Sequence, residues 1–410
     1  MSIYTDAQEI IHSALEACLP DQAVRRALEG KELGSGRVFL VALGKAAWQM
    51  ARCAAELLGP RLEQGVVVTK YGHSQGDIPR CQVFEGGHPV PDEGSFRGTR
   101  AAMELVQDLA PQDTVVLLVS GGGSALFERP LIPAEELAQL TSALLACGAD
   151  IVEMNTVRKR LSAVKGGRFA QLCAPAQVYS IVLSDILGDP LDMIASGPAY
   201  PDRSTCAQAR AIAEKYQLPL SGQARALLDQ ETPKELDNVE TVITGSVREL
   251  CSAAAAACQR LGYETHILTD QLCCQAREAG SFLASIARTH GQEGRSLAFL
   301  AGGETVVLLT GKGLGGRNQE LALSAAEGIS GMENALIFSL GSDGTDGPTD
   351  AAGGIVDGQT RGKLAQAGLT IHQVLADNDA YHALEKVDGL IRTGPTGTNV
   401  NDVAVVLLKG

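Results

Sequence analysis

The sequence predicts a two-domain α/β protein, and three observations carry the prediction. Short apolar runs rich in β-branched residues alternate with helical segments, which is typical of a doubly wound, mostly parallel sheet. The chain has 410 residues, more than one hydrophobic core normally serves, so two domains are expected. Hydrophobic residues make up 45% and aromatic residues only 4%, an aliphatic composition that suits such sheets.

The first half of the chain shows this alternation most clearly. After one or two helices near the amino terminus, each apolar run is followed by a segment with helical periodicity. The expected strands are Val38–Leu43, Gly65–Thr69, Val115–Val119 and Val178–Leu183. The expected helices are residues 3–29, 46–57, 95–109 and 134–147, and one that begins at residue 155.

A polar, charge-rich stretch at residues 230–238 is the best candidate for a domain boundary. We therefore expect an N-terminal domain over residues 1–236 and a C-terminal domain over residues 237–410, opened by a strand at Val239–Thr244. Later strands are expected at residues 266–268, 297–300, 305–310, 335–340 and 403–408, and helices at residues 252–261, up to 290, and 318–327. The sequence leaves open whether a terminal segment crosses between the domains.

Charge and composition narrow the class of partner. The net charge of −14 argues against a nucleic acid or an anionic membrane surface as partner. The amino terminus lacks a basic segment followed by an apolar core, and no apolar run approaches the roughly 20 residues that span a membrane. Ten cysteines without a CxxC pair predict reduced, packed thiols. We expect a cytoplasmic protein, monomeric or homodimeric, with small-molecule ligands.

A glycine-rich loop after a buried strand is the strongest candidate site. The loop reads Ser120-Gly121-Gly122-Gly123-Ser124, and glycines let backbone N–H groups crowd around a phosphate. A tight turn would need one glycine, so three glycines between two serines favour the anion site. Lys45 follows an earlier strand, at a helix start where a cation opposes the macrodipole. It is either a solvated lysine or, as we favour, a phosphate contact.

Basic and polar side chains in the same half form a second set of candidates. Asn155 opens a run of cations that extends to Lys165 and the glycine pair after it, and an anion site and a solvated helix face explain this run equally well. His88 lies in a loop that begins with two glycines. We place Lys165 with the phosphate-binding residues, and His88 and Asn155 with the substrate-binding residues.

Acidic loops follow two of the expected strands. Asp185 and Asp189 come after one strand and Asp343 after another, where carboxylates hold Mg²⁺ or accept a proton from a substrate hydroxyl. Aspartates that cap helices are the alternative. We select Asp189 and Asp343 as candidate metal ligands. Glu304 and Arg317 flank a second glycine-rich loop, and arginine suits bidentate contacts to phosphate. We place Glu304 with the substrate.

The second glycine-rich loop also supports a different function. Gly311, Gly313 and Gly316 match GxGxxG, the dinucleotide fingerprint, which predicts an NAD(P)H-dependent reductase. The acidic residue that binds the ribose is expected about 20 residues later, and Asp343 is somewhat late for that role. A third alternative is a non-catalytic phosphosugar sensor, although an attached DNA-binding module, which would support it, is not visible.

Eight motifs resemble those of the class II glycerate kinase family, whose C-terminal half is called the MOFRL domain. They are VALGKAAWQMA, GGHPVPDEGS, LLVSGGGSALF, MNTVRKRLSAVKGGR, SDILGDPLDMIASGP, AGGETVVLLTGKGLGGRNQELAL, SLGSDGTDGPTDAAGG and TGPTGTNVNDV. The resemblance implies an N-terminal Rossmann-like domain and a C-terminal α/β domain with a mixed sheet. It also implies ATP-dependent, Mg²⁺-requiring phosphorylation of D-glycerate to 2-phosphoglycerate in a cleft between them. Members of the family are often labelled hydroxypyruvate reductase.

The resemblance also assigns residues to roles. The family's essential Lys, Asp and Arg match Lys45, Asp185 and Arg317. In the kinase hypothesis Lys45 and Arg317 stabilise the transferring phosphoryl group, and Asp185 orients or deprotonates the attacking hydroxyl. Backbone N–H groups of residues 120–124 hold the nucleotide phosphates.

Overall fold

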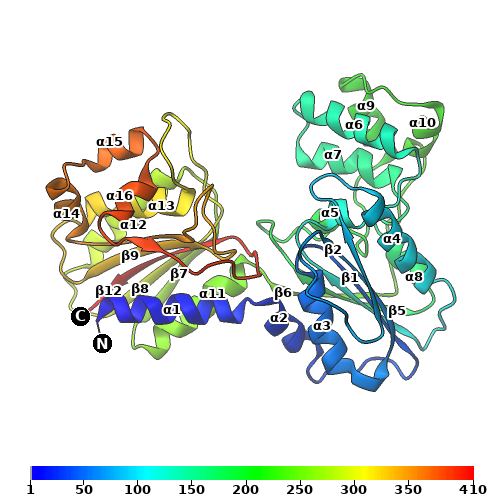
Figure 1. The fold of residues 1–410 in the computed structure, drawn as a ribbon, viewed down its shortest axis with the longest axis horizontal. Helices are drawn as coiled ribbons and strands as arrows, with labels where there is room; N and C mark the ends of the chain where they lie inside the picture. Colours follow the sequence, from blue (N-terminus) through cyan, green and yellow to red (C-terminus); the bar gives the residue numbers. More distant parts are fainter. Residues whose placement is uncertain (1) are drawn as a thin grey trace. The chain divides into compact units, whose positions relative to one another are not determined.

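The computed structural model describes residues 2–410 and divides them into two compact units. The central unit comprises residues 23–183 and 189–244. The terminal unit comprises residues 2–22, 184–188 and 245–410, so it holds both ends of the chain. In each unit a six-stranded sheet carries helices (Figure 1).

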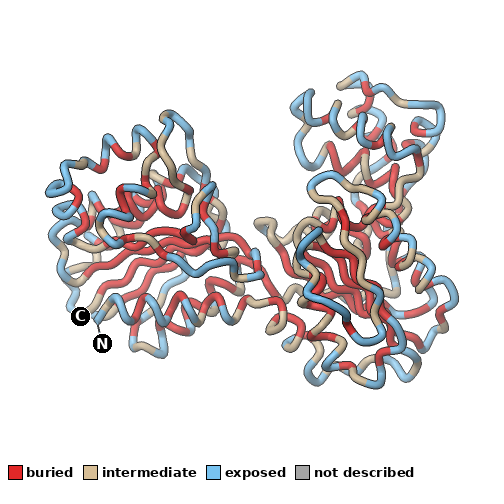
Figure 2. Tube along the Cα trace, in the orientation of Figure 1, coloured by how far each residue is buried: buried red, intermediate tan, exposed pale blue. Residues whose placement is uncertain are grey.

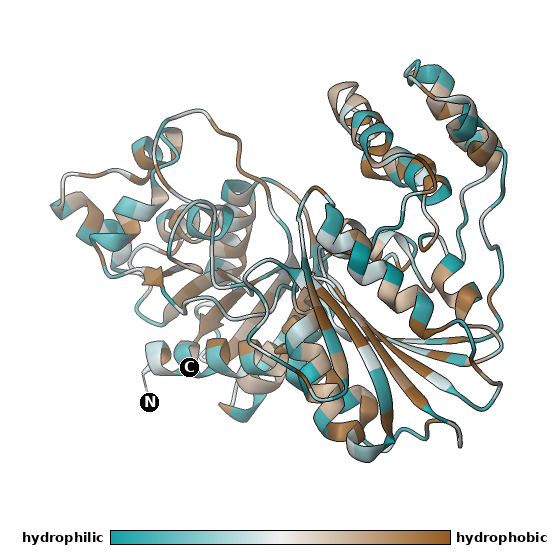
Figure 3. Cartoon of the chain, turned by 45° about the vertical axis from the view of Figure 1, so that its right-hand side comes forward, coloured by the Kyte–Doolittle hydropathy of each residue, from teal (hydrophilic) through white to brown (hydrophobic). Residues whose placement is uncertain are grey.

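The sheet of the central unit has the strand order β3-β2-β1-β4-β5-β6. Its strands are β1 (Val38–Leu43), β2 (Leu62–Lys70), β3 (Cys81–Gly86), β4 (Thr114–Val119), β5 (Gln177–Leu183) and β6 (Val239–Gly245). Neighbours from β3 to β5 pair in parallel, and β1 and β4 are buried along their whole length (Figure 2). A strand that is covered on both faces needs apolar side chains at every position, which explains the unbroken apolar runs, brown in Figure 3. The predicted mostly parallel sheet is confirmed.

Helices of the central unit form two groups. The first accompanies the sheet and comprises α2 (Pro20–Leu28), α3 (Ala47–Leu58), α4 (Glu93–Leu105), α5 (Gly123–Leu126) and α8 (Arg168–Cys173). The second, which we call the cap helices, comprises α6 (Ala134–Ala146), α7 (Ile151–Arg158), α9 (Cys206–Lys215) and α10 (Gly222–Leu228). The cap helices lie together in Figure 1 and bury a small leucine-rich core of their own. Asp150 and Thr205 begin α7 and α9 with capping boxes, which fixes where these helices start.

The terminal unit contains a mixed sheet with the order β11-β10-β9-β12-β8-β7. Its strands are β7 (Glu264–Leu272), β8 (Leu297–Gly303), β9 (Ala335–Gly341), β10 (Gly353–Asp357), β11 (Leu390–Ile391) and β12 (Asp402–Leu408). Its helices are α1 (Ile3–Ala17), α11 (Val247–Arg260), α12 (Ala276–His290), α13 (Arg317–Gly328), α14 (Thr360–Gln366), α15 (Ile371–Ala376) and α16 (Ala380–Glu385). Helices α1 and α11 cover one face of the sheet, and α12 and α13 cover the other (Figure 1). The mixed sheet that the resemblance implied is confirmed.

The last strand of the chain is central to this sheet. Strand β12 pairs antiparallel with both β8 and β9, and this register sets Asp402 opposite Gly303 on one side and Gly341 on the other. The loops that follow β8 and β9 therefore meet at the start of β12. This convergence brings together residues near positions 304, 342 and 401.

Two expectations differ from the structure. Val239–Gly245 does not open the second sheet, because β6 lies beside β5 at the edge of the first. The boundary between residues 236 and 237 remains a prediction, while the compact units change at residues 244–245 and assign residues 2–22 to the terminal unit. Residues 305–310 are not a strand; they form an irregular loop with a single parallel bridge between Val306 and Gln275. Apolar periodicity alone could not distinguish this exposed loop from a strand.

Candidate active site

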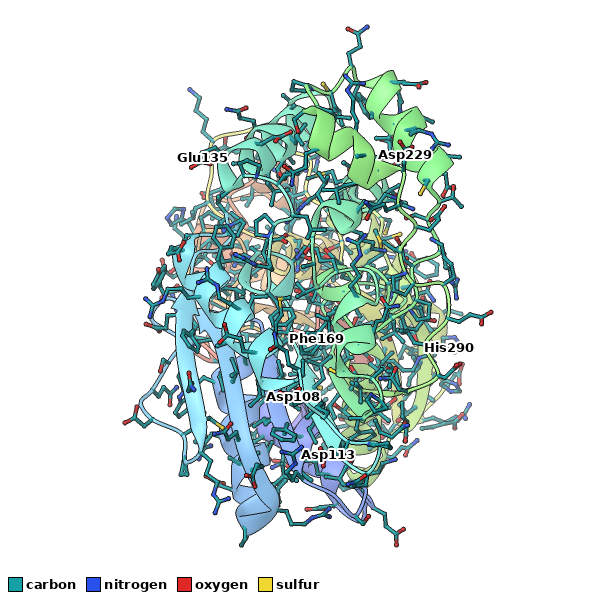
Figure 4. The ribbon with its side chains drawn as sticks, turned by 90° about the vertical axis from the view of Figure 1, so that its right-hand side faces the viewer. Asp108, Asp113, Glu135, Phe169, Asp229 and His290 are labelled. Atoms are coloured by element: carbon teal, nitrogen blue, oxygen red, sulfur yellow. The ribbon has the colours of Figure 1, made fainter. Side chains whose placement is uncertain are left out.

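The central unit gathers its predicted residues where β1 and β4 end. Asp113, just before β4, lies toward one end of the unit, and Glu135 and Asp229 of the cap-helix region lie toward the other (Figure 4). Strand β4 therefore runs toward the cap helices, and the glycine loop follows its last residue. This is the edge at which open α/β sheets bind ligands.

Ser120 connects the glycine loop to the end of β1 and the loop after it through hydrogen bonds. Its hydroxyl accepts a hydrogen bond from the Ala46 N–H (3.1 Å) and donates to the Leu43 carbonyl (3.2 Å), which its own N–H also contacts at 3.0 Å. Gly44 has φ +113°, and a Cβ there would lie 2.3 Å from the Ser120 hydroxyl. The expectation that Ser120 gives its N–H to a phosphate is therefore wrong, because that donor is already used within the sheet.

The next four amides are placed differently. Among residues 2–410, no hydrogen-bond acceptor is assigned to the N–H groups of residues 121–124, at the start of the short helix α5. Gly122 has φ +83°, and a Cβ there would lie 3.1 Å from His88 Nε2 and 3.2 Å from Lys45 Cγ. Lys45 also donates its backbone N–H to the Gly121 carbonyl at 2.8 Å. Free amides, a lysine and an imidazole thus surround one glycine turn, which suits an anionic ligand.

The pKa of His88 reflects the positive charge around this turn. Partial burial lowers the pKa of His88, and the nearby cations Lys45, Lys70 and His73 lower it further. The imidazole is therefore neutral at pH 7 and acts as a hydrogen-bonding group in a cationic environment.

Lys165 lies beneath the glycine loop and not on its ligand side. It is fully buried, and its ammonium donates to the Ser124 carbonyl (2.8 Å) and the Phe127 carbonyl (2.9 Å) and pairs with Glu128 at 3.2 Å. Burial lowers the pKa of Lys165 to about 8. Two of its three N–H donors are used by backbone carbonyls, and the buried ammonium lies beside the Glu128 carboxylate, away from solvent. The prediction of a direct phosphate contact is revised: Lys165 supports the loop.

Asn155 also acts on the loop from behind. The Ser196 hydroxyl donates to Asn155 Oδ1 at 2.9 Å and is linked to the Ser124 hydroxyl at 2.9 Å. Asn155 is 3% exposed, so the structure places it as a support of the loop. The neighbouring cations Lys159 and Arg160 are buried and pair with Asp202. The basic run is therefore neither a solvated helix face nor, for these two residues, an open anion site.

The acidic loop after β5 is divided between the two units. Asp185 belongs to the terminal unit, where its carbonyl accepts from the Asn401 side chain at 3.1 Å. Asp189 belongs to the central unit, has φ +51°, and keeps one buried carboxylate oxygen without a hydrogen-bond partner among residues 2–410. A non-glycine residue in the left-handed region with an unpaired oxygen is typical of a functional loop.

In the terminal unit, Arg317 is held by two carboxylates. Its Nε and Nη2 donate to the two oxygens of Asp402 at 2.5 and 3.0 Å, and its Nη1 donates to Glu304 at 2.8 Å. These anions raise the pKa of Arg317, which stays charged, while burial raises the pKa of Asp402. These contacts use three of the five N–H donors of the guanidinium, so two N–H donors remain for an oxyanion. Asp402 lies in the motif TGPTGTNVNDV, and no role was predicted for it from the sequence.

Asp346 fixes the start of the helix that carries Arg317. Its two carboxylate oxygens accept from the N–H groups of Asn318 (3.1 Å) and Gln319 (2.8 Å), and burial raises its pKa to about 6. A Cβ on Gly316 would lie 2.2 Å from the Asp346 carboxyl carbon. Gly316 is therefore required by the cap, and a carboxylate already occupies the end of the helix.

The rest of the second glycine loop is also satisfied internally. Thr310 and Gly311 donate their N–H groups to Asn378 Oδ1, and Lys312 and Leu314 donate theirs to the side chains of Asp377 and Asp379. A dinucleotide fingerprint needs these amides and the helix end free for a pyrophosphate. This loop meets neither condition, so its GxGxxG spacing reflects close packing.

The candidate metal ligands do not form a preformed site. Asp343 accepts from the Thr345 N–H at 2.9 Å, and Asp189 lies in the other unit. Within residues 2–410 there is no group of three or more His, Cys, Asp or Glu side chains that suits a metal ion. Magnesium is commonly held by one or two carboxylates together with substrate phosphates and water, so single aspartates fit it. Among the described helices, none is long and apolar enough to cross a membrane.

Comparison with known proteins agrees with this architecture. DUF4147, a domain of unknown function, matches residues 6–229, and the MOFRL family matches residues 297–402. The chain is 52% identical to the D-glycerate 2-kinase of Thermotoga maritima over 408 residues, which cover 98% of this chain and 97% of the relative. A crystal structure of glycerate kinase from Thermotoga maritima has a TM-score of 0.95 and 52% identity, and the match covers 98% of this chain and 99% of that one.

A relative with a different name lies further away. A putative hydroxypyruvate reductase of Agrobacterium vitis is 38% identical over 420 residues, which cover 98% of this chain and 93% of the relative. Fold and site thus define a two-unit α/β protein with a DUF4147 part and a MOFRL part. The chain belongs to the MOFRL-domain glycerate kinase family, and the resemblance seen in the sequence is confirmed.

Proposed function

We propose that the protein is a glycerate 2-kinase, which transfers the γ-phosphoryl group of ATP to D-glycerate and forms 2-phosphoglycerate. The observation that carries the proposal is the 52% identity to a D-glycerate 2-kinase over nearly the full chain. The site supports it, because phosphoryl transfer needs positioning and charge neutralisation more than covalent chemistry.

Each cluster suits one part of this reaction. The free amides of residues 121–124, with Lys45 beside them, fit the phosphates of the nucleotide. The two remaining N–H donors of Arg317 fit the equatorial oxygens of the transferring group. Asp185 orients or deprotonates the attacking hydroxyl. His88 and Glu304 remain the proposed contacts of the acid substrate, and Asn155 acts on the site through Ser196.

Magnesium enters the proposal through single carboxylates. Asp343 and Asp189 are the residues that would hold it, together with nucleotide phosphates and water. The ion neutralises charge on the nucleotide phosphates when it is bound. Glu304 and Asp402 already share Arg317, so neither is free to act mainly as a metal ligand.

A reductase is the alternative function, and the second glycine loop argues against it. The amides that would bind a nicotinamide dinucleotide are used by Asn378 and by the neighbouring aspartates, and Asp346 would repel a pyrophosphate at the helix end. A sensor without catalytic function would not need the arginine and the aspartates of the terminal unit.

A coupled assay with D-glycerate, ATP and Mg²⁺, with ³¹P NMR of the product, tests the proposal. We expect ATP-dependent formation of 2-phosphoglycerate. Formation of 3-phosphoglycerate would keep the kinase and reject the regiochemistry. Parallel reactions with hydroxypyruvate and NADH or NADPH should give no nicotinamide oxidation; oxidation without phosphorylation would overturn the proposal.

A further inference from the structure

One buried side chain in the terminal unit has an unused hydrogen-bond acceptor beside the residues of the proposed reaction. Asn401 is 4% exposed, and no donor among residues 2–410 reaches its Oδ1 atom. A buried amide oxygen without a donor loses its hydrogen bonds to water and gains none in the fold, so such an atom needs an explanation. A ligand that supplies the missing donor is one.

The other half of the same amide fixes its orientation. Asn401 Nδ2 donates to the Asp185 carbonyl at 3.1 Å and to Glu304 Oε2 at 3.2 Å. Both partners are pure acceptors, so the nitrogen must face them and the oxygen must face away. Asn401 therefore links the candidate general base to the carboxylate that contacts Arg317.

Strand pairing explains why this residue stands at the junction. Asn401 directly precedes β12, and the antiparallel register sets it opposite Glu304 on one side and Ser342 on the other. Its carbonyl accepts from the Ser342 N–H at 3.0 Å. Its backbone has φ +64°, in the left-handed region that glycine and asparagine adopt most readily. A glycine can therefore replace Asn401 with its backbone in the same conformation.

We propose that Asn401 is a specificity-determining residue whose Oδ1 accepts a hydrogen bond from the hydroxyl of the substrate that is not phosphorylated. The inference rests on the proposed function, because it needs a hydroxy acid as phosphoryl acceptor. Asn401 contacts the backbone carbonyl of Asp185, the residue proposed to act on the reacting hydroxyl, so a hydroxyl on the next carbon is the group that we assign to Oδ1. Sites that hydrogen-bond a substrate hydroxyl reject analogues without it, since a buried polar group is then left unpaired.

Substrate discrimination separates this role from a structural one. The wild-type protein and Asn401→Gly are compared for kcat/KM with D-glycerate and with D-lactate, which lacks the second hydroxyl. We expect the wild type to prefer D-glycerate by about 10³-fold or more, and Asn401→Gly to lower that preference to about tenfold or less, through loss on D-glycerate. The thermal midpoint of Asn401→Gly should fall, because glycine removes the two hydrogen bonds of Nδ2, so the preference between the two acids and not the stability is the readout.

Two further variants complete the test. Asn401→Asp keeps an acceptor but sets an oxygen against Glu304 Oε2, so activity on both substrates should fall. Asn378→Gly is the matched control: Asn378 is also buried and left-handed (φ +56°), but its amide is fully paired within the second glycine loop. It should lose stability and keep the preference for D-glycerate.

The outcomes of the glycine substitution are distinct. If Asn401→Gly loses activity on both acids in equal proportion, or keeps the wild-type preference, the inference is overturned. If Asn401→Gly does not fold, the wild type decides: a preference for D-glycerate over D-lactate below about tenfold overturns the inference. If the wild type does not phosphorylate D-glycerate, the proposed function fails instead, and the two failures are separate.

Discussion

The two glycine-rich loops of this protein look alike in sequence and differ in what their amides do. Within the part of the chain that the structure describes, the N–H groups of residues 121–124 have no acceptor, and they lie beside Lys45 and His88. Residues 311–316 lie against the segment at Asp377–Asp379, which takes up the donors of the loop. A glycine-rich pattern thus indicates that another group comes close to the backbone. The pattern does not show whether that group is a ligand or another segment of the same chain.

The largest expected effect is a difference in kcat between alanine variants of the two lysines, one in each glycine-rich region. Lys45→Ala should lower kcat by about 10³-fold or more, because a cation beside transferring phosphates supplies electrostatic stabilisation. Lys312→Ala, in the second loop, should change kcat by less than about twofold, since Lys312 is exposed in a loop whose donors serve the fold. Steady-state kinetics with D-glycerate and ATP, with circular dichroism as the folding control, measures both. Equal effects from the two lysines would remove the distinction.

A second expectation concerns the arginine of the terminal unit. Arg317→Ala should lower kcat by about 10³-fold, and Arg317→Lys should recover little of it. Lysine restores the charge but cannot form the side-on pair with Asp402 while it presents a second pair of donors. Kinetics of both variants, at matched thermal stability, checks this. Near-wild-type activity in Arg317→Lys would show that charge alone suffices.

Glycine substitutions test the same comparison at the backbone. Gly122→Ala adds a Cβ near His88 and Lys45 in a left-handed turn, so kcat/KM should fall by about 10²-fold. Gly313→Ala adds a Cβ 2.4 Å from the Asp379 side chain, so its main effect should be a loss of about 1–3 kcal/mol of stability. Urea unfolding together with kinetics gives both quantities. The reverse pattern, stability lost at Gly122 and activity at Gly313, would exchange the roles of the loops.

Much of the architecture could be predicted from the sequence, because strands buried on both faces appear as unbroken runs of apolar residues. The apolar runs of β1, β4 and β5 could hardly be anything else in a chain of this composition. Strand β6 was assigned to the wrong sheet because its apolar pattern predicts a strand but does not predict which strand it pairs with. The strand predicted at residues 305–310 was wrong for a related reason. Val306, Leu308 and Leu309 are exposed in the structure, and the hydropathy of a sequence does not show whether its residues are buried.

Side chains at strand ends could be selected from the sequence as candidates, whereas the inward orientation of other side chains could not be predicted. Lys45 was selected because a cation at a helix start opposes the macrodipole, and Arg317 because arginine suits bidentate contacts to phosphate; the roles of both stay predictions. Lys165 was assigned to a ligand because the sequence around residue 165 gives no sign that Glu128 and two backbone carbonyls would contact its ammonium. Asn401 was missed because its importance comes from strand register, which places residues 304, 342 and 401 side by side.

The smallest expected effect is a pH dependence at the first loop. Burial and nearby cations lower the pKa of His88 in the folded protein below the value of about 6.5 for an unfolded chain. The folded state therefore binds fewer protons than the unfolded state as the pH falls below 6.5, and stability must decrease in that range. His88→Gln removes the titrating group, so its unfolding midpoint should change less between pH 7.5 and pH 5.5 than that of the wild type. His372→Gln, at an exposed position of the terminal unit, is the matched control and should follow the wild type. Parallel curves for the wild type and His88→Gln would mean that the imidazole does not share the cationic environment of Lys45, and the first loop would lose one of its supports as an anion site.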